Sequence, residues 1–207
     1  SSDLVAQFEI KRGLILAADG KTVLAANVAQ TLAGQKLFFR RYPTHGFASQ
    51  TVGYSTQSRS RAGLERTLNS YLTASDANLG SIFSSLGDRL KGTTITGNNV
   101  VLTLNVKAQK VAESLLQGVC GAAVAWNPQT GGIYAMASTP SYDPNLIETP
   151  KGYAKIQATK APCTPAAPLL NRATQGLYPP GSTFKTITAA RSEEHTSELQ
   201  SHLNLVC

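Results

Sequence analysis

Ser182 and Lys185 are the residues whose types and spacing could do chemistry; they lie in the segment YPPGSTFK at 178–185. Residues i and i+3 share one face of a helix, so the lysine amine can reach the serine hydroxyl. A lysine held away from water can lose its proton and then serve as the base that activates this hydroxyl as a nucleophile. A chain this rich in serine and lysine contains roughly one Ser-x-x-Lys match by chance, so the surroundings must decide.

The residues around this pair predict a helix that begins at Ser182. Pro179-Pro180-Gly181 interrupts the chain directly before it, a sequence typical of a helix start. A residue in the first turn has unpaired backbone N–H groups and the positive end of the helix dipole beside it. The N–H of Ser182 is therefore the natural first donor of an oxyanion hole. We expect the apolar Phe184, Ile187 and Ala190 to seat this helix in the core.

The sequence gives little support to a phosphate-binding loop or to a zinc site. Gly20-Lys21-Thr22 imitates the end of a P-loop, but Ile15 occupies the position of its first glycine. Cys120 and Cys163 fit no zinc spacing and have no histidine nearby. They are compatible either with a disulfide or with two separate buried thiols. No metal and no cofactor are predicted.

The composition predicts a globular chain with a basic surface. The formal net charge is +7 and 42% of the residues are hydrophobic, enough for one medium domain or two small ones. The positive charges are dispersed and lack interleaved aromatic residues, which argues against a nucleic-acid partner. No stretch approaches the roughly 18–20 apolar residues of a membrane span. Because the chain opens at Ser1 without a methionine, an anchor upstream is left open.

The first part of the chain predicts short strands and one clear helix. Residues 12–16 and 22–26 flank an Asp19-Gly20 turn and predict a hairpin. The next apolar run is only 37–39. A single helix is expected over 63–72, where one apolar stripe repeats at helical spacing.

The second part begins near residue 97. A strand is expected over 100–104, followed by a helix over 106–116 with Asn105 as its N-cap. The clearest hairpin pairs 121–126 with 132–137, and its small apolar residues suggest a sheet covered on both faces. Residues 138–168 hold six of the ten prolines and are expected to be loop.

Several of these stretches together resemble the class B penicillin-binding proteins, the peptidoglycan D,D-transpeptidases, most closely those of actinobacterial type. Arg12-Gly13, Arg41-Tyr42-Pro43 and Gly63-Leu64-Glu65 resemble landmarks of the family's pedestal, or dimerisation, module. Residues 102–109 resemble the entry into its transpeptidase domain. The near-continuous match is to 122–145, then to Asn171-Arg172-Ala173 and 178–185.

The resemblance implies an α+β fold in two parts. A mixed pedestal module is expected over 1–96. The N-terminal part of a transpeptidase domain of the penicillin-binding and serine β-lactamase-like type, with helices on an antiparallel sheet, is expected over 97–190 and is incomplete.

The resemblance also implies the roles of the two residues. Ser182 would attack the D-Ala-D-Ala carbonyl of a stem peptide, and Lys185 would take the hydroxyl proton. A β-lactam would acylate Ser182 in the same way. Asn171 and Arg172 are expected to be scaffold groups rather than catalytic ones. The family further implies a membrane-anchored protein on the extracytoplasmic face of the cell membrane, working with a glycosyltransferase partner.

The chain departs from the family pattern in two places. Ala17-Ala18 stands where the family usually has an Asp-Arg pair, which puts the pedestal contacts there in doubt. The family's Ser-x-Asn and Lys-Thr-Gly motifs occur nowhere in the sequence and would lie downstream of Ala190. We therefore expect the chain as written to be inactive.

The last residues, 191–207, are predicted to be a non-native tail. Residues 191–201 match the translation of a common sequencing-library adapter, and they carry three of the twelve acidic residues. Two other functions remain open: a non-catalytic cell-wall interaction module, or a serine β-lactamase or β-lactam sensor that shares Ser-x-x-Lys. The long segment ahead of the motif argues against the second.

Overall fold

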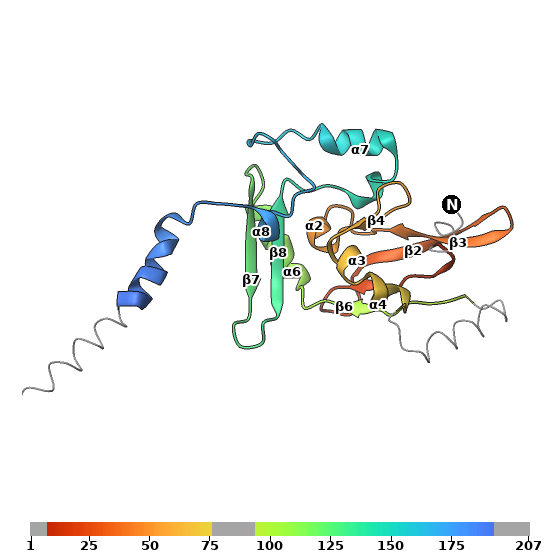
Figure 1. Ribbon diagram of the computed structural model, residues 1–207, viewed down its shortest axis with the longest axis horizontal. Helices are drawn as coiled ribbons and strands as arrows, with labels where there is room; N and C mark the ends of the chain where they lie inside the picture. The colour runs from red at the N-terminus through yellow and green to blue at the C-terminus, as the bar shows by residue number, and fades with distance from the viewer. Residues whose placement is uncertain (1–7, 76–93, 193–207) are drawn as a thin grey trace, which may run out of the picture. The chain divides into compact units, whose positions relative to one another are not determined.

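The computed structural model describes residues 8–75 and 94–192 (Figure 1). The chain divides into two compact units, Ser1–Gly176 and Leu177–Cys207. The first unit mixes short helices with small sheets, so the predicted α+β class is confirmed. In the part of the chain that the structure describes, no helix has the length and apolar character needed to cross a membrane.

A four-stranded sheet organises the early part of the first unit. Its strand order is β3 (Gln35–Arg41), β2 (Val23–Leu32), β1 (Ile15–Leu16) and β6 (Val100–Val101). β1 pairs antiparallel with β2 and parallel with β6, so the entry into the later part of the chain is a strand of this sheet.

The predicted hairpin across the Asp19 turn is confirmed. Its register pairs Ile15 with Ala25. The Asp19 carboxylate accepts hydrogen bonds from the N–H groups of Lys21 and Thr22 and from the Thr22 hydroxyl. These bonds, the one from the Thr22 hydroxyl first, lower the pKa of Asp19 to about 2.

The longer hairpin of β2 and β3 was not predicted. Seven residue pairs join the two strands around a turn at Ala33 and Gly34, both with positive φ. The apolar residues on the outer half of β2 are exposed rather than buried. The strand therefore lacks the one-sided alternation on which sequence-based recognition depends.

The remaining elements of this early part are short. They are α2 (Ser49–Val52), β4 (Tyr54–Ser55), β5 (Arg61–Ala62), α3 (Gly63–Thr67) and α4 (Asn69–Thr73). The single helix expected over 63–72 is wrong in one respect, because it breaks at Leu68 (φ −101°, ψ 23°) into α3 and α4. Threonine, asparagine and serine around the break are weak helix formers, so packing decides the local geometry.

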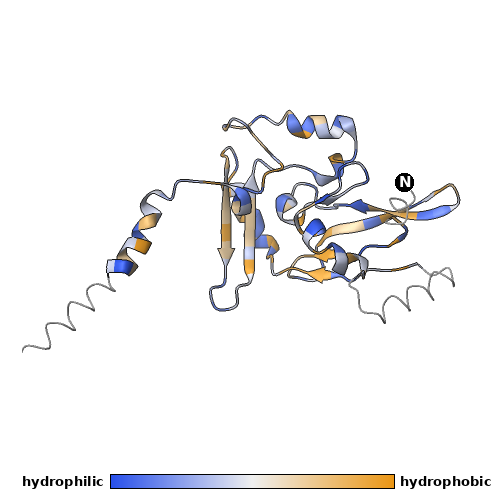
Figure 2. Cartoon of the chain, viewed as in Figure 1, coloured by the Kyte–Doolittle hydropathy of each residue, from blue (hydrophilic) through white to orange (hydrophobic). Residues whose placement is uncertain are grey.

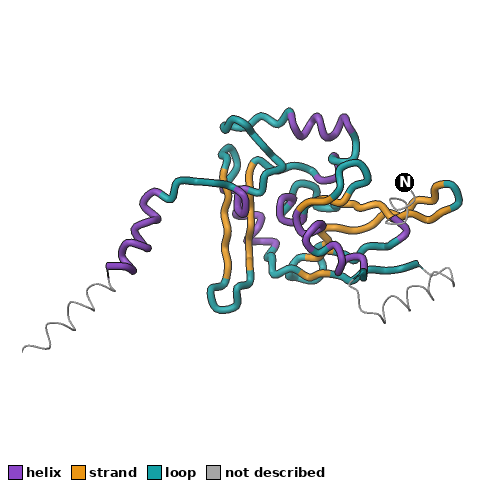
Figure 3. Tube along the Cα trace, in the orientation of Figure 1, coloured by secondary structure: helices purple, strands orange, loops and turns teal. Residues whose placement is uncertain are grey.

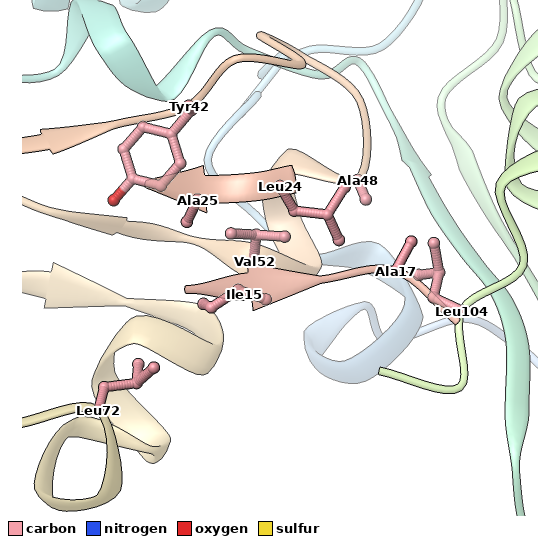
Figure 4. Packing of buried hydrophobic residues seen from close by; sticks show 9 residues of the cluster. All are labelled: Ile15, Ala17, Leu24, Ala25, Tyr42, Ala48, Val52, Leu72 and Leu104. Carbon is pink, nitrogen blue, oxygen red and sulfur yellow. The ribbon is translucent and has the colours of Figure 1, made fainter. Parts of the chain in front are cut away.

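One hydrophobic core joins these elements (Figure 4). Ile15 of β1, Leu24 of β2, Val52 of α2 and Leu72 of α4 are almost completely buried. Leu104, from the segment after β6, is buried in the same cluster. The core therefore spans the sequence boundary between the two expected modules.

The later part of the first unit is built on a two-stranded sheet of β7 (Gly121–Trp126) and β8 (Ile133–Thr139). Helix α6 (Val106–Leu115) lies against the face that carries Ala123, Ala125 and Ala135. Helix α8 (Arg172–Gln175) bonds to Ser138, which faces the opposite side because strand residues alternate. Figure 2 shows mostly apolar colouring along both strands, and the expected hairpin is confirmed. The expected cover over both faces is wrong for much of the sheet, because Val124, Trp126 and Tyr134 are exposed.

Residues 138–168 are not all loop, as was expected. They contain a 3-10 turn, η1 (Pro144–Leu146), and a helix, α7 (Pro150–Gln157). The start of α7 was visible in the sequence, since Thr149 caps it with its hydroxyl and Pro150 stands in its first turn. The long teal stretch between α7 and α8 in Figure 3 is the remaining loop.

Candidate functional site

The segment with Ser182 and Lys185 forms a helix start, as expected. A 3-10 turn, η2 (Gly181–Phe184), follows Pro180 and runs on as a helix over 185–192. The backbone N–H of Lys185 bonds back to the carbonyl groups of Ser182 and Thr183. With three residues per 3-10 turn, the side chains of positions 182 and 185 project from the same side. The geometry therefore brings the hydroxyl and the amine to one face of the helix start.

The water-excluded site that an activated lysine needs is not present in the described part of the second unit. Ser182 and Lys185 are both exposed, and no residue of 177–192 shields the lysine amine from water. Phe184 and Ile187, expected to seat the helix in a core, are 53% and 59% exposed. The described part of this unit is too short to bury them, because one helix offers no second layer to cover its apolar face.

Arg172 stabilises the loop that precedes α8. Its guanidinium donates to the carbonyl oxygens of Ala166 (2.7 Å) and Ala167 (3.2 Å). Its backbone N–H donates to the Ser138 hydroxyl (3.0 Å), which in turn donates to the Leu170 carbonyl. These bonds hold the loop before α8 against β8, and they confirm the expected scaffold role of Arg172.

Asn171 has the other expected scaffold role. Its side chain accepts the N–H of Ala173 and so caps the start of α8. A cap of this kind fixes where the short helix begins. The helix ends at Gln175, and the first unit ends one residue later, at Gly176.

Cys120 and Cys163 form a disulfide with a Cα–Cα distance of 6.0 Å. It joins the residue just before β7 to the loop between α7 and α8. Of the two alternatives that the sequence left open, the structure has the disulfide.

Gln50 of α2 bonds the early part of the unit to the same region. Its side-chain amide donates to the carbonyl oxygens of Pro140 (2.9 Å) and Pro168 (3.2 Å), and the residue is buried. Sequence reasoning missed Gln50, since a glutamine in a short helix carries no signal of this contact.

A second contact of this kind joins the loop after β3 to η1. The Asn145 amide accepts the N–H of Tyr42 and donates to the Tyr42 carbonyl, both at 2.9 Å. Nearby, His45 Nδ1 lies 2.8 Å from the Asp143 carboxylate. Burial alone would raise the pKa of Asp143, but hydrogen bonds from His45 and Asn145 outweigh it and lower that pKa.

Gln109 of α6 connects a third pair of elements. Its fully buried amide donates to the Met136 carbonyl of β8 and accepts the Met136 N–H. It also donates to Glu113, whose carboxylate accepts the N–H of Ala48. The helix, the sheet and the early part of the unit are therefore held by one hydrogen-bonded chain.

The larger of the two described cavities is not at the Ser-x-x-Lys pair. It has a volume of about 730 Å³ and opens between the early and later parts of the first unit. Its walls include Leu64 and Arg66 of α3, Leu102, and Thr174 of α8. It is therefore a feature of the first unit and does not identify a substrate pocket.

The departure at Ala17-Ala18 leaves the local fold intact. Ala17 is fully buried, and its N–H donates to the Thr22 carbonyl. The N–H of Ala18 donates to the Leu104 carbonyl at 3.0 Å. The backbone thus makes the contacts between the first turn and the segment after β6 without the family's charged pair.

Two known protein-family models match this chain. The model of the penicillin-binding protein transpeptidase domain matches residues 121–197, and that of the penicillin-binding protein A dimerisation domain matches residues 12–100. Together with the similarity to the relatives named next, these matches place the chain in the penicillin-binding protein family, and residues 12–100 are the part that matches the dimerisation domain.

The curated relatives are named as peptidoglycan D,D-transpeptidases. PbpA of Mycolicibacterium smegmatis is 36% identical over 97% of this chain, and the match covers 41% of that protein. MrdA of Escherichia coli K12 is 46% identical over 45% of this chain, covering 14% of that protein. Among solved structures, the imipenem acyl-enzyme complex of penicillin-binding protein A from M. tuberculosis has a TM-score of 0.74. It is 35% identical over 90% of this chain, which covers 43% of it. The chain thus spans less than half the length of these proteins.

The predicted domain boundaries and the predicted tail stay predictions. The two family matches do not meet, and they leave 101–120 unassigned. Residues 193–207 of the expected non-native tail lie outside the described residues.

Proposed function

We propose that the protein to which this chain belongs is a peptidoglycan D,D-transpeptidase that acts through an acyl-enzyme on Ser182. The observation that carries this proposal is the Ser-x-x-Lys pair at the start of a helix, in a chain with both penicillin-binding protein family matches. Relatives with these modules are named for this activity. The dimerisation match also favours it over a β-lactamase or a β-lactam sensor.

In the proposed mechanism, Lys185 as free amine takes the Ser182 proton while the hydroxyl oxygen attacks the carbonyl of the D-Ala-D-Ala bond. The terminal D-Ala leaves, and the acyl group stays on Ser182 until the amine of a second stem peptide displaces it. The Ser182 N–H, at the helix start, stabilises the oxyanion, and loss of one such donor costs about 10²–10³ in rate.

The lysine can be a base only if the rest of the protein covers it. The lysine side chain is exposed in this structure, whereas a lysine that activates a nucleophile needs a site shielded from water. The proposal therefore requires the remaining transpeptidase segments to pack over the exposed side chains of Phe184 and Ile187. We propose a site on the extracytoplasmic side of the cell membrane, with an anchor and a glycosyltransferase partner outside this chain.

The test begins with sequencing the gene across the Ala190 codon from unfragmented DNA and expressing the complete product. A fluorescent penicillin should label it covalently, Ser182→Ala should abolish the label, and Lys185→Ala should slow labelling by at least about 10²-fold. Thr186→Ala, one position beyond the pair, is the matched control. Undiminished labelling of Ser182→Ala would overturn the assignment of the nucleophile. A genuine stop codon after Cys207 would favour the non-catalytic cell-wall interaction module instead.

A further inference from the structure

The disulfide between Cys120 and Cys163 has a charged group against one of its two sulfurs. Nη2 of Arg172 lies 3.5 Å from Cys163 Sγ. Among the described contacts, the guanidinium touches only this sulfur of the pair. Both cysteines are partly exposed, so a small thiol can reach the bond.

The positive charge of Arg172 is not neutralised by a carboxylate among the described residues, so it acts on that sulfur. The residue is 7% exposed, and within residues 8–75 and 94–192 it forms no ion pair with a carboxylate. Its other guanidinium partners are the neutral carbonyl oxygens of Ala166 and Ala167. A buried cation without a counterion favours negative charge on a neighbouring atom.

The asymmetry sets a direction for thiol–disulfide exchange. An adjacent arginine stabilises a thiolate and lowers the pKa of its thiol. In exchange, the sulfur whose thiol has the lower pKa leaves faster. Cys163 is therefore the better leaving group, and Cys120 is the sulfur that an incoming thiolate attacks.

We propose that this disulfide is a redox-exchangeable site that an external dithiol opens at Cys120. The attacking thiolate forms a bond to Cys120 Sγ, the bond between the two cysteine sulfurs breaks, and its electron pair goes to Cys163 Sγ beside Arg172. The second thiol of the reagent then displaces Cys120. The protein disulfide gains two electrons and two protons, and the dithiol is oxidised to its disulfide.

The loop stays near β7 after the bond opens. Three side chains donate hydrogen bonds to backbone carbonyl oxygens of this loop. Gln50 donates to Pro168 and Ser138 donates to Leu170. Arg172 donates to Ala166 and Ala167. None of these contacts involves Cys120. The two sulfurs therefore remain close, and reoxidation should restore the same pair.

The first test maps the mixed disulfide. The 207-residue chain with Cys207→Ser is treated with reduced glutathione, quenched in acid, alkylated and digested for mass spectrometry. The expected product has glutathione on Cys120 and alkylated Cys163. Equal adducts on both cysteines, or glutathione mainly on Cys163, would overturn the proposal.

The second test removes the charge. In a Cys120→Ser, Cys207→Ser background, the rate of iodoacetamide reaction at Cys163 is measured at pH 7. Arg172→Gln should lower it about tenfold, which corresponds to a rise of about one unit in the thiol pKa, while Arg172→Lys should keep most of it. Equal rates in all three proteins would contradict the assigned role of Arg172.

A third measurement does not depend on whether the arginine variants fold. With Arg172 intact, the pH profile of alkylation is compared between Cys163 in the Cys120→Ser chain and Cys120 in the Cys163→Ser chain. Arg172 is the charged group that the described contacts place at Cys163, so the Cys163 profile should have its midpoint at lower pH. Coincident profiles would overturn the proposed direction of exchange.

Discussion

Arg12 and Arg172 are both buried arginines, one in the early part of the first unit and one in the later part, and they have different partners. Arg12 pairs with the fully buried Glu65 at 2.9 Å and also bonds to Asn69. Arg172 pairs with carbonyl oxygens and lies against a disulfide sulfur. One region depends on a buried carboxylate, and the other depends on neutral backbone groups and a covalent bond. The two regions should therefore lose stability under different conditions.

In the early region, the carboxylate of one residue, Glu65, pairs with two arginines. Glu65 also accepts a hydrogen bond from Arg40, whose Nη2 is buried without a partner in the described residues. Burial lowers the pKa of Arg12, with Glu65 opposing that effect. Two guanidinium groups therefore rely on one carboxylate.

The largest expected effect comes from removing that carboxylate. Glu65→Ala leaves the charges of Arg12 and Arg40 uncompensated in the interior, and we expect a loss of about 3–5 kcal/mol in the free energy of unfolding. Urea unfolding of the purified chain measures it. Glu9→Ala, at an exposed position, is the matched control and should change little. A loss below about 1 kcal/mol for Glu65→Ala would mean that the cluster is not what holds this region.

The next effect comes from removing the covalent bond in the later region. Replacing Cys120 and Cys163 together by serine should lower the free energy of unfolding by about 2–4 kcal/mol, because the unfolded chain gains freedom across 43 residues. Cys207→Ser alone serves as the reference protein. An unchanged urea midpoint would show that the hydrogen bonds of Arg172 hold the loop without the disulfide.

A smaller effect tests a single hydrogen bond next to Arg172. Asn171→Ala removes the cap of α8, and such caps contribute about 1 kcal/mol. Gln157→Ala, at the exposed end of α7, is the control measured in the same urea series. A loss as large as that of the double cysteine variant would mean that α8, rather than the disulfide, organises the loop.

The smallest effect is the response of each region to acid. The lowered pKa values of Asp19 (about 2) and Asp143 mean that both carboxylates stabilise the fold above the ordinary pKa of about 3.9. This contribution is lost as the pH falls through the folded-state pKa. Asp19→Asn and Asp143→Asn should each reduce the decline in the urea midpoint between about pH 4 and about pH 2. A decline equal to that of the parent chain would contradict the assigned hydrogen bonds.

Local signals in the sequence predicted much of this structure. The hairpins at Asp19 and over 121–137, the cap at Asn105 and the helix start at Ser182 each depend on a few adjacent residues. The signals for α7 were present at Thr149 and Pro150, but the surrounding prolines obscured them. The break at Leu68 had no such signal, since tertiary packing chose between one helix and two.

The sequence by itself determined the family-like motifs, the α+β class and the spacing that puts a lysine and a serine on one face of a helix start. Adjacent residues suffice for these, because caps, turns and i to i+3 contacts are local. The tertiary structure decided that Cys120 pairs with Cys163, that Arg172 lies against that bond and that Gln50 reaches Pro140 and Pro168. These groups lie far apart along the chain, and only the packing of α2, β8 and α8 around one loop brings them within bonding distance.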